Sequence, residues 1–314
     1  MVLKDSFGRP LLNMRVAITS RCDLRCHYCH MEGERRNDSG FLKEMRSDEI
    51  GRIVKIAASL GVTGVKLTGG EPLVRKDVLE IVEEISSTQG LSDLAMTTNG
   101  ALLAPLARHL YTRGLKRVNI SLPTLDADVY GKLTGGRIED VLQGVKAAVA
   151  VGFSPVKLNM LILRCVNEYD FPAMLRLASD SGAILQLIEL EPVNVDEGYY
   201  LANHKSLDDY ESTLKPKAMK VETRRFMQNR RIYHLPDVDV EVVHPTENVE
   251  FCRNCTRLRV TSDGQLKPCL MKNDNLVDIL TPMRNGADDN EIERLFLLAN
   301  QRRQPFEETT QSEF

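Results

Sequence analysis

The first two thirds of the chain alternate short apolar runs with longer amphipathic runs. The short runs are rich in β-branched and aliphatic residues, and their lengths suit strands that are buried on both faces. Six strands are predicted in this way: Met14–Thr19, Val65–Thr68, Leu94–Thr98, Val118–Leu122, Val156–Leu161 and Leu185–Leu190.

Between the apolar runs, apolar positions recur with the period of a helix. The segment from Ser47 to Leu60 is predicted to be a helix with Ser47 as its N-cap. Further helices are predicted at Val78–Ile85, Leu102–Tyr111, Ile138–Val149 and Phe171–Ala178. Several of these segments are followed by a glycine suited to end a helix: Gly61, Gly90, Gly114, Gly152 and Gly182.

Six β/α units in succession predict an α/β fold with a parallel sheet and right-handed crossovers. Six units are too few for the eight-stranded barrel, so an open, partial (β/α)6 TIM-like barrel is favoured over a flat doubly wound sheet, although periodicity alone does not separate the two. Both architectures collect ligands at the carboxyl ends of the strands. Polar residues lie at or near these ends: Thr68–Glu71, Thr97–Asn99, Ser121, Gln186 and the pair Glu189 and Glu191, while Lys157 and Asn159 share one face of the fifth strand.

The pattern changes after Leu214. Lys215–Arg231 is strongly basic, Val238–Val243 alternates like a strand, and the last residues are charged and predicted to form a mobile tail. We therefore expect a partial barrel over residues 1–220 and a C-terminal extension over residues 221–314.

Composition narrows the class of protein. Hydrophobic residues make up 42% of the 314 residues and charged residues 27%, as in an ordinary globular protein. A formal net charge of −3 gives no general reason to bind nucleic acid or membrane surfaces. No apolar run approaches the roughly 20 residues of a bilayer span, and the first ten residues lack the apolar core of a secretory signal. A cytoplasmic protein is expected.

Seven cysteines are present, and six of them form two triplets more than 200 residues apart in the sequence. A secreted disulfide scaffold would be short and dense in cysteine, so clustered metal ligands in a reducing compartment are favoured. The seventh, Cys165, is predicted to be a small buried hydrophobic residue.

The first triplet is Cys22, Cys26 and Cys29, directly after the first predicted strand. Iron–sulfur clusters normally take four thiolates, so three would leave one iron open for chemistry. The alternative is a zinc site completed by His27 or His30, but closed zinc sites are usually built from two separated ligand pairs.

The second triplet is Cys252, Cys255 and Cys269. Two short β runs flank Asp263-Gly264, a strong hairpin signal, and a hairpin would return Cys269 towards the other two cysteines. A second 4Fe-4S cluster with an open iron is favoured over zinc completed by a histidine such as His244. Arg257 and Arg259 share one face of the hairpin beside this site and would suit an anionic ligand.

These motifs resemble the radical SAM superfamily. The likeness rests on the spacing of Cys22, Cys26 and Cys29 with Tyr28 before the last cysteine, and on Gly69-Gly70-Glu71-Pro72 after the second strand. The resemblance implies a 4Fe-4S cluster whose open iron binds S-adenosyl-L-methionine, and reductive cleavage to a 5′-deoxyadenosyl radical. It also implies cofactor contacts at Tyr28, Gly70 and Ser121. A simpler explanation of the two glycines is a tight turn that needs backbone angles only glycine adopts readily.

Within that superfamily, the chain is similar to the GTP 3′,8-cyclases, the molybdenum cofactor biosynthesis protein A family. The likeness reaches to about Leu280 and rests on Asn13-Met14-Arg15-Val16, Leu67–Leu73, Thr97–Gly100, Phe251–Arg259, Asp263-Gly264 and Leu266–Leu270. The resemblance implies a lyase that forms (8S)-3′,8-cyclo-7,8-dihydroguanosine 5′-triphosphate in molybdopterin biosynthesis. In that reaction the radical removes H3′ of the ribose and C3′ attacks C8 of guanine. GTP-binding positions would be Arg15, Lys66, Thr97, Lys157, Arg257, Leu258 and Arg259.

Asp5–Pro10 and Gln186 look more like archaeal members of this family than bacterial ones. Bacterial relatives have an arginine at the position of Gln186 and end in Gly-Gly, whereas this chain ends in Gln311–Phe314, so one contact and the role of that tail must differ here. The expected partners are GTP, an electron donor protein, the next enzyme of the molybdopterin pathway and a second copy in a homodimer. No protein acid or base is assigned.

Two other hypotheses stay open at this point. One is a radical SAM enzyme with a different substrate, such as a peptide-modifying maturase, which would be expected to carry a peptide-binding domain and further cysteines. The other is a zinc-stapled binding module without catalysis. Iron analysis separates the second from both enzymes.

Overall fold

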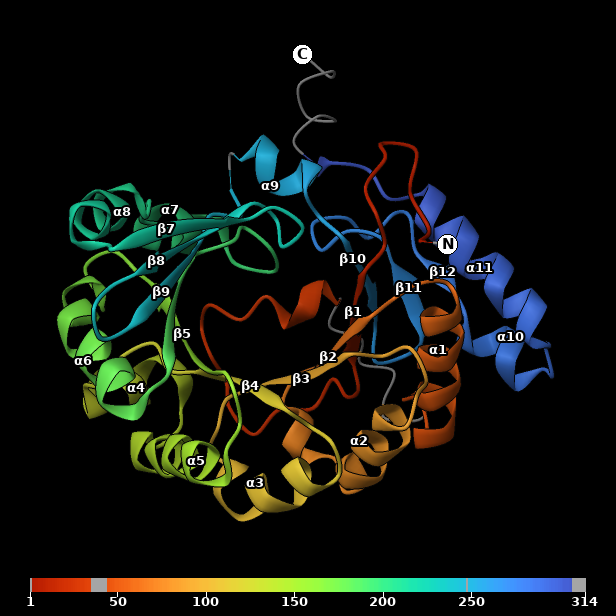
Figure 1. Cartoon of the computed structure of the whole chain (residues 1–314), viewed down its shortest axis with the longest axis horizontal. Helices are drawn as coiled ribbons and strands as arrows, with labels where there is room; N and C mark the ends of the chain where they lie inside the picture. Colours follow the sequence, from red (N-terminus) through yellow and green to blue (C-terminus); the bar gives the residue numbers. More distant parts are fainter. Residues whose placement is uncertain (1, 35–43, 247, 307–314) are drawn as a thin grey trace.

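A single curved sheet organises the computed structural model, which describes residues 2–34, 44–246 and 248–306. Figure 1 shows the strands curving around a central space, with most helices on the outside. Within the described residues the sheet has twelve strands in the order β12-β11-β10-β1-β2-β3-β4-β5-β6-β9-β8-β7. The strands are β1 Asn13–Ala17, β2 Gly64–Thr68, β3 Asp93–Thr98, β4 Arg117–Ser121, β5 Val156–Ile162, β6 Ile184–Glu189, β7 Lys220–Arg224, β8 Arg230–His234, β9 Asp239–Val243, β10 Arg257–Val260, β11 Gln265–Lys267 and β12 Val277–Asp278.

The six predicted strands are confirmed as β1 to β6. They pair in parallel and in chain order, from β1 with β2 through to β5 with β6. A doubly wound sheet would reverse its strand order at a switch point, so the sequential order identifies the barrel-like alternative. The edge strands of the described sheet, β7 and β12, do not pair with each other, and the barrel is open.

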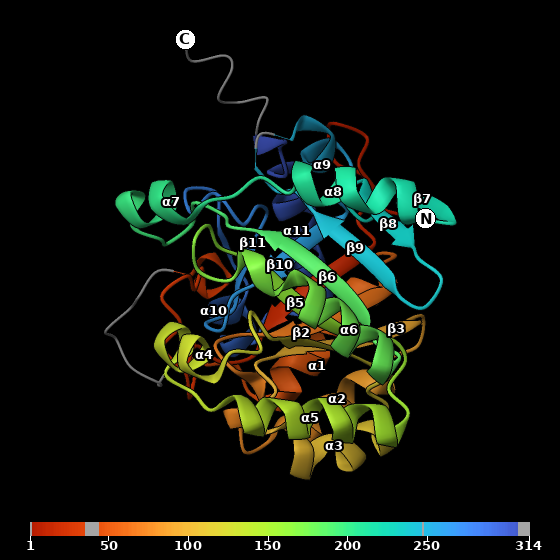
Figure 2. The same ribbon diagram turned by 90° about the vertical axis from the view of Figure 1, so that its left-hand side faces the viewer.

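Helices follow the strands on the outer side of the sheet, as the side view in Figure 2 shows for α2, α3, α5 and α6. The predicted N-cap at Ser47 is wrong: α1 begins at Ser47, and Arg46 is the capping position because its N–H donates to Glu49. The Ser47 hydroxyl instead donates to Glu80 at 2.6 Å. The α-helices are α1 Ser47–Ser59, α2 Val78–Ser86, α3 Leu103–Thr112, α4 Ala127–Thr134, α5 Ile138–Val151, α6 Phe171–Ser181, α7 Glu197–Asn203, α8 Asp208–Leu214, α9 Val249–Arg253, α10 Leu280–Arg284 and α11 Asp289–Gln301.

The C-terminal extension adds strands to both edges of the six-stranded sheet. β9 pairs in parallel with β6, and β10 pairs in parallel with β1. The predicted mobile tail is wrong as far as residue 306, because α11 packs against β11 and β12, and Phe296 and Arg303 are fully buried. The last residues, Gln311–Phe314, lie outside the described part of the chain.

One continuous hydrophobic core lies between the sheet and the outer helices, and it also takes in residues of the extension such as Leu258, Leu266 and Phe296. Cys165 does not belong to it. The predicted burial of Cys165 is wrong: this residue is exposed in a turn after β5, with a left-handed φ of 58° and its N–H bonded to Glu168. Among the described helices, none combines the length and apolar character that a membrane span requires.

Candidate active site

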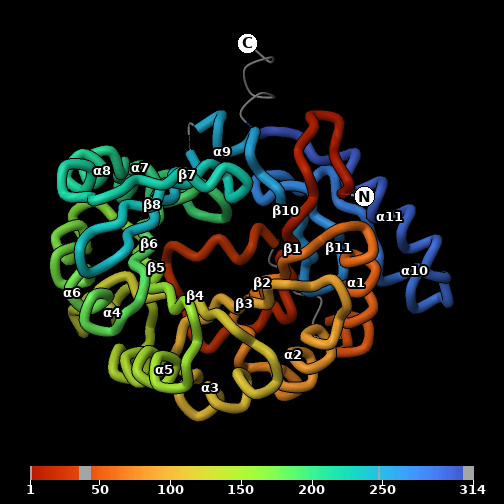
Figure 3. Tube along the Cα trace, in the orientation of Figure 1, coloured from red at the N-terminus to blue at the C-terminus, as the bar shows by residue number. Residues whose placement is uncertain are grey.

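The loop that carries the first cysteine triplet follows β1 and crosses the space enclosed by the strands (Figure 3). Backbone N–H groups of Leu24 and Met31 donate to the sulfur atoms of Cys22 and Cys29, each at 3.4 Å. Burial and the neighbouring Cys29 raise the pKa of the Cys26 thiol to about 12. A bound metal cation would lower this pKa again, because a cation favours the thiolate and the thiolate is the form that ligates metal. The loop therefore fits a metal centre.

Gly69 and Gly70 hold this loop against the end of β2. A side-chain carbon at Gly70 would lie 2.2 Å from the carbonyl oxygen of Arg21, and one at Gly69 would lie 2.3 Å from that of Thr19. The N–H groups of Gly70 and Glu71 donate to those same carbonyl oxygens, of Thr19 and Arg21, each at 2.8 Å. Both glycines are thus needed for close backbone approach between strand end and cysteine loop, in addition to any contact with a cofactor.

The second triplet is held by two buried arginines from the chain's opposite ends. Arg9 donates to the carbonyl oxygen of Cys252 at 2.9 Å, and Arg303 donates to that of Cys255 at 2.7 Å. Burial opposes ionisation of Cys255, but the positive charges of Arg257, Arg303 and Arg9 outweigh it and lower the pKa of this thiol. The surroundings of Cys255 therefore favour a thiolate, the form that binds iron.

The predicted hairpin is confirmed, since β10 and β11 pair antiparallel on either side of Asp263-Gly264. Within the described residues, one group of three metal-ligating side chains has its ligand atoms within 4.8 Å of one another, namely Asp208, Glu211 and His244. His244 lies between Glu189 at 3.5 Å and Glu211 at 3.2 Å.

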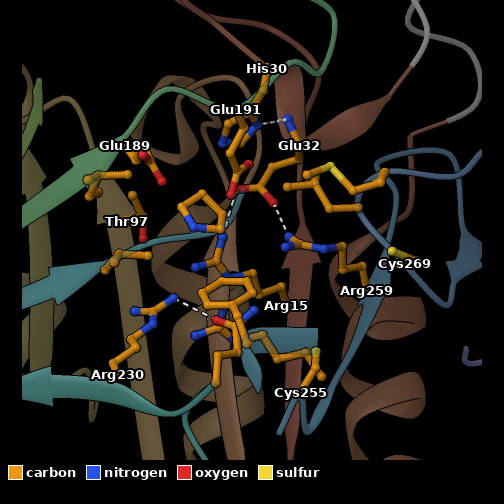
Figure 4. A pocket seen from close by; sticks show the side chains of 18 of the residues that line it. Arg15, His30, Glu32, Thr97, Glu189, Glu191, Arg230, Cys255, Arg259 and Cys269 are labelled. Carbon is orange, nitrogen blue, oxygen red and sulfur yellow. Dashed lines mark hydrogen bonds and ion pairs between the residues drawn. The ribbon is translucent and has the colours of Figure 1, made fainter. Parts of the chain in front are cut away.

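A cavity of about 230 Å³ lies inside the barrel and reaches both cysteine regions. Tyr28 and His30 from the first loop line it, together with Cys252, Cys255 and Cys269 of the second triplet. Figure 4 shows Cys255 and Cys269 on the same side as Arg259, with Thr97 and Glu189 on the other. The cavity is therefore placed to hold a molecule between the two predicted metal centres.

Most predicted binding residues meet at this cavity, and a few do not. Those that line it are Arg15, Tyr28, Lys66, Thr97, Ser121, Arg257 and Arg259. The side chain of Leu258 points to the opposite face of β10 and is fully buried in the core, which leaves only its backbone for a ligand. Lys157 lies at a smaller cavity of about 30 Å³, where it pairs with the buried carboxylate of Glu241.

Sequence reasoning missed several cavity residues. Glu32 reaches in from the loop after the first triplet, and Asn119 accepts a hydrogen bond from Lys66 at 3.0 Å. Asn119 also donates to Gln186 at 3.2 Å, which gives Gln186 a partner in the barrel floor. Arg230 comes from the basic stretch Lys215–Arg231, in which the sequence does not show which of several arginines lines the cavity.

Positive charge prevails in the cavity. Among the described residues, its lining has six arginine or lysine side chains and three carboxylates: Arg9, Arg15, Lys66, Arg230, Arg257 and Arg259 against Glu32, Glu189 and Glu191. Burial opposes the charge of Glu32, but Arg15 and Arg259 outweigh it and lower its pKa to about 2. Burial and the nearby charges of Arg15 and Lys157 lower the pKa of Lys66 well below its usual value. A multiply charged anion would relieve this repulsion.

Similarity to known proteins agrees with this geometry. A Radical SAM superfamily profile matches residues 16–178, and a Molybdenum Cofactor Synthesis C profile matches residues 183–308. The fold resembles that of SuiB from Streptococcus suis bound to its precursor peptide SuiA, with a TM-score of 0.63 and 17% identity over 86% of this chain and 61% of that one. It also resembles methylornithine synthase (PylB), with a TM-score of 0.55 and 16% identity over 91% of this chain and 86% of that one.

The fold and the first cysteine loop thus define a member of the radical SAM superfamily. Similar protein sequences identify the family within this superfamily. The probable GTP 3′,8-cyclase of Methanocaldococcus jannaschii is 44% identical over 306 residues, covering 97% of this chain and 99% of that protein. That of Thermococcus kodakarensis is 44% identical over 314 residues, covering 97% of this chain and 99% of that protein. The chain belongs to the GTP 3′,8-cyclase family.

Proposed function

We propose that this chain converts GTP to (8S)-3′,8-cyclo-7,8-dihydroguanosine 5′-triphosphate in molybdenum cofactor biosynthesis. The observation that carries the proposal is a cavity that touches the first cysteine loop through Tyr28 and His30, includes all three cysteines of the second triplet, and has more positive side chains than carboxylates in its lining. One end offers room for a radical source beside the first loop, and the other offers arginines beside the second triplet. A nucleoside triphosphate, which carries about four negative charges, suits that distribution.

Cys22, Cys26 and Cys29 would hold the first 4Fe-4S cluster and leave one iron for S-adenosylmethionine. When bound, this pair supplies the 5′-deoxyadenosyl radical that removes hydrogen from the substrate. Tyr28 and Ser121 line the cavity and would contact the cofactor, while Gly70 would offer its backbone beside the loop. Tyr28 is partly buried beside Cys26 of the first triplet, and burial raises the pKa of its phenol well above the usual value, so it stays a neutral hydrogen-bond donor.

Cys252, Cys255 and Cys269 would hold a second 4Fe-4S cluster, whose open iron would meet guanine. Arg257 and Arg259 lie on the cavity face of β10, and both are buried, with 7% and 8% exposure. Strand pairing places Arg15 of β1 directly beside Arg259 of β10. These three side chains would bind the triphosphate, with Lys66, Thr97 and Lys157 on the neighbouring strands.

The protein's own contribution is positioning and exclusion of water. Strands from both edges of the sheet surround the substrate, and C3′ of its ribose must lie close to C8 of guanine for the ring to close. Holding reacting groups in such an orientation can lower a barrier by about 7–11 kcal/mol. Buried surroundings also protect a carbon radical from solvent and oxidants.

The test is an anaerobic assay with dithionite, S-adenosylmethionine and GTP. We expect 5′-deoxyadenosine to form in a GTP-dependent manner, together with the cyclised triphosphate. A peptide-modifying enzyme would instead show no response to GTP. Arg257→Ala is expected to weaken GTP binding while both clusters keep their absorbance, and loss of cluster absorbance would give this arginine a structural role.

Iron analysis separates the enzyme from a zinc-stapled binding module. Two 4Fe-4S clusters require about eight iron atoms and eight sulfides per chain. One or two zinc ions with no iron would overturn the proposal. Replacing Cys269 with serine should leave about four irons, because the first cluster would take its ligands from Cys22, Cys26 and Cys29 alone.

A further inference from the structure

Arg230 is a buried arginine that the extension contributes to the cavity. It begins β8, which pairs with β9, and β9 in turn pairs with β6 of the barrel. Its side chain is 8% exposed and lines both the main cavity and the smaller one beneath it. In Figure 4, Arg230 and Arg259 lie on either side of Arg15.

The hydrogen bonds of Arg230 are incomplete. A guanidinium carries five N–H donors, and one Nη donates to the side-chain oxygen of Gln228 at 2.7 Å. The other Nη lies 3.9 Å from Glu241, at the outer limit of an ion pair. The Nε donor is buried and has no hydrogen-bond partner. A buried donor left in this state is unfavourable and points to a missing acceptor.

The charge of Arg230 is also poorly matched. Glu241 is its one close carboxylate partner among the described residues, and that carboxylate is shared with Lys157 and with Arg224 at 3.2 Å. Arg15 repels Arg230, and burial together with the charge of Arg230 lowers the pKa of Arg257 well below its usual value. Burial lowers the pKa of Arg230 to about 10, so it remains charged near neutral pH. The arginines around this position therefore need an anion that the protein does not supply.

We propose that Arg230 binds the triphosphate of the nucleotide together with Arg15 and Arg257. The proposal rests on the function proposed above and adds a substrate-binding residue from the opposite edge of the sheet. A guanidinium fork matches phosphate oxygens in a bidentate manner, which would satisfy the free Nε. Three converging arginines fit a polyphosphate better than the single carboxylate of S-adenosylmethionine. The neighbouring Gln186 of β6 is neutral and bonded to Asn119, so the positive charge on this side comes from β8.

Binding of GTP and of guanosine to the reconstituted chain, measured by anaerobic equilibrium dialysis, tests this proposal. Arg230→Gln should weaken GTP binding about ten- to a hundredfold, as expected for loss of charge-assisted hydrogen bonds. Guanosine affinity and iron content should stay unchanged. Arg230→Lys keeps the charge without the fork and should weaken GTP binding by a smaller factor. Arg231→Gln is the matched control, because Arg231 follows on the same strand, is 56% exposed and pairs with Glu211 at 3.0 Å outside the cavity.

Several outcomes would overturn the proposal. One is a GTP affinity of Arg230→Gln equal to that of the wild type. Another is an equal loss of GTP and guanosine binding, which would mean general disruption of the cavity. A third is weakened binding of S-adenosylmethionine alone. If Arg230→Gln does not fold, unchanged GTP affinity in Arg230→Lys overturns the proposal in its place. A wild type that binds no GTP would contradict the proposed function itself, and the two failures are thereby distinguishable.

Discussion

Glu32 and Arg259 form an ion pair of 2.7 Å that joins the loop after the first cysteine triplet to the hairpin of the second. The other oxygen of Glu32 lies 3.5 Å from Arg15. Met31 and Glu32 have left-handed φ values of 48° and 51°, which non-glycine residues seldom adopt, and this turn directs the carboxylate into the cavity. The carboxylate thus holds two of the arginines that the proposed function assigns to GTP.

Glu32→Gln is expected to bind GTP about three- to tenfold more tightly than the wild type. The triphosphate would no longer have to displace a carboxylate from Arg15 and Arg259, each exchange being worth about 1 kcal/mol. The same substitution leaves buried arginines without a counter-charge, so the free energy of unfolding should fall by about 3 kcal/mol. Anaerobic dialysis with GTP and urea denaturation measure the two effects.

Glu34→Gln is the matched control for this prediction. Glu34 is two residues away and bridges to the same hairpin, but its partners are the N–H and hydroxyl of Ser262, at 2.9 and 2.7 Å. GTP affinity should therefore stay at the wild-type value in this variant. Unchanged or weaker GTP binding by Glu32→Gln would contradict the idea that its carboxylate competes with phosphate.

Gly70→Ala is expected to lose the first cluster. The added methyl group would lie 2.2 Å from the carbonyl oxygen of Arg21, and backbone atoms cannot yield as a flexible side chain does. The loop carrying Cys22 must then shift, and the purified protein should hold about four irons in place of eight. Gly131→Ala is the control, because its methyl group would meet only an atom 3.8 Å away. Full iron content in Gly70→Ala would show that the loop adapts.

Lys157→Met separates two roles of this lysine. Its partner Glu241 is fully buried, so loss of Lys157 should lower the free energy of unfolding by roughly 2–4 kcal/mol. The loss is not larger because Arg224 and Arg230 also lie near the carboxylate of Glu241 and balance part of its charge. If Lys157 also contacts GTP as proposed, affinity for GTP falls in Lys157→Met, whereas in Glu241→Gln, which breaks the same pair and also releases Arg224 and Arg230, affinity stays the same or rises. Equal GTP affinity in both variants would leave Lys157 with a structural role alone.

The sequence predicted the barrel well because parallel strands buried on both faces are continuous apolar runs. The predicted Val156–Leu161 and the observed Val156–Ile162 differ by one residue, for example. Helix α4 was missed because, over its eight residues, Asp128, Gly131 and Lys132 interrupt the apolar pattern. No local pattern could show that the extension adds strands to both sheet edges, since pairing of β10 with β1 joins residues more than 240 positions apart.

The residues of the candidate site also divide into those that local sequence shows and those that only the fold shows. Motif spacing located both cysteine triplets and the arginine pair on β10, because these ligands lie close together in the sequence. Arg230 and Glu32 escaped notice because burial, and not sequence spacing, makes each unusual. Arg230 lies in a stretch where Arg224, Arg225 and Arg231 are as basic and only the fold shows which one is enclosed.

His244 is expected to make the stability of the protein fall at alkaline pH. Burial opposes its charge, but hydrogen bonds to Glu189 and Glu211 outweigh burial and raise its pKa to about 9, with Asp208 and Arg231 as the other charged groups nearby. Because this folded-state pKa is above the unfolded value of about 6.5, protonation stabilises the fold fully below pH 6.5, and the benefit disappears as the pH rises through 9. Between pH 7 and 9.5 the free energy of unfolding should drop by roughly 2 kcal/mol. Urea denaturation of wild type and His244→Gln over this range measures the difference. A gap between the two proteins that stays constant with pH would show that His244 is neutral in the fold.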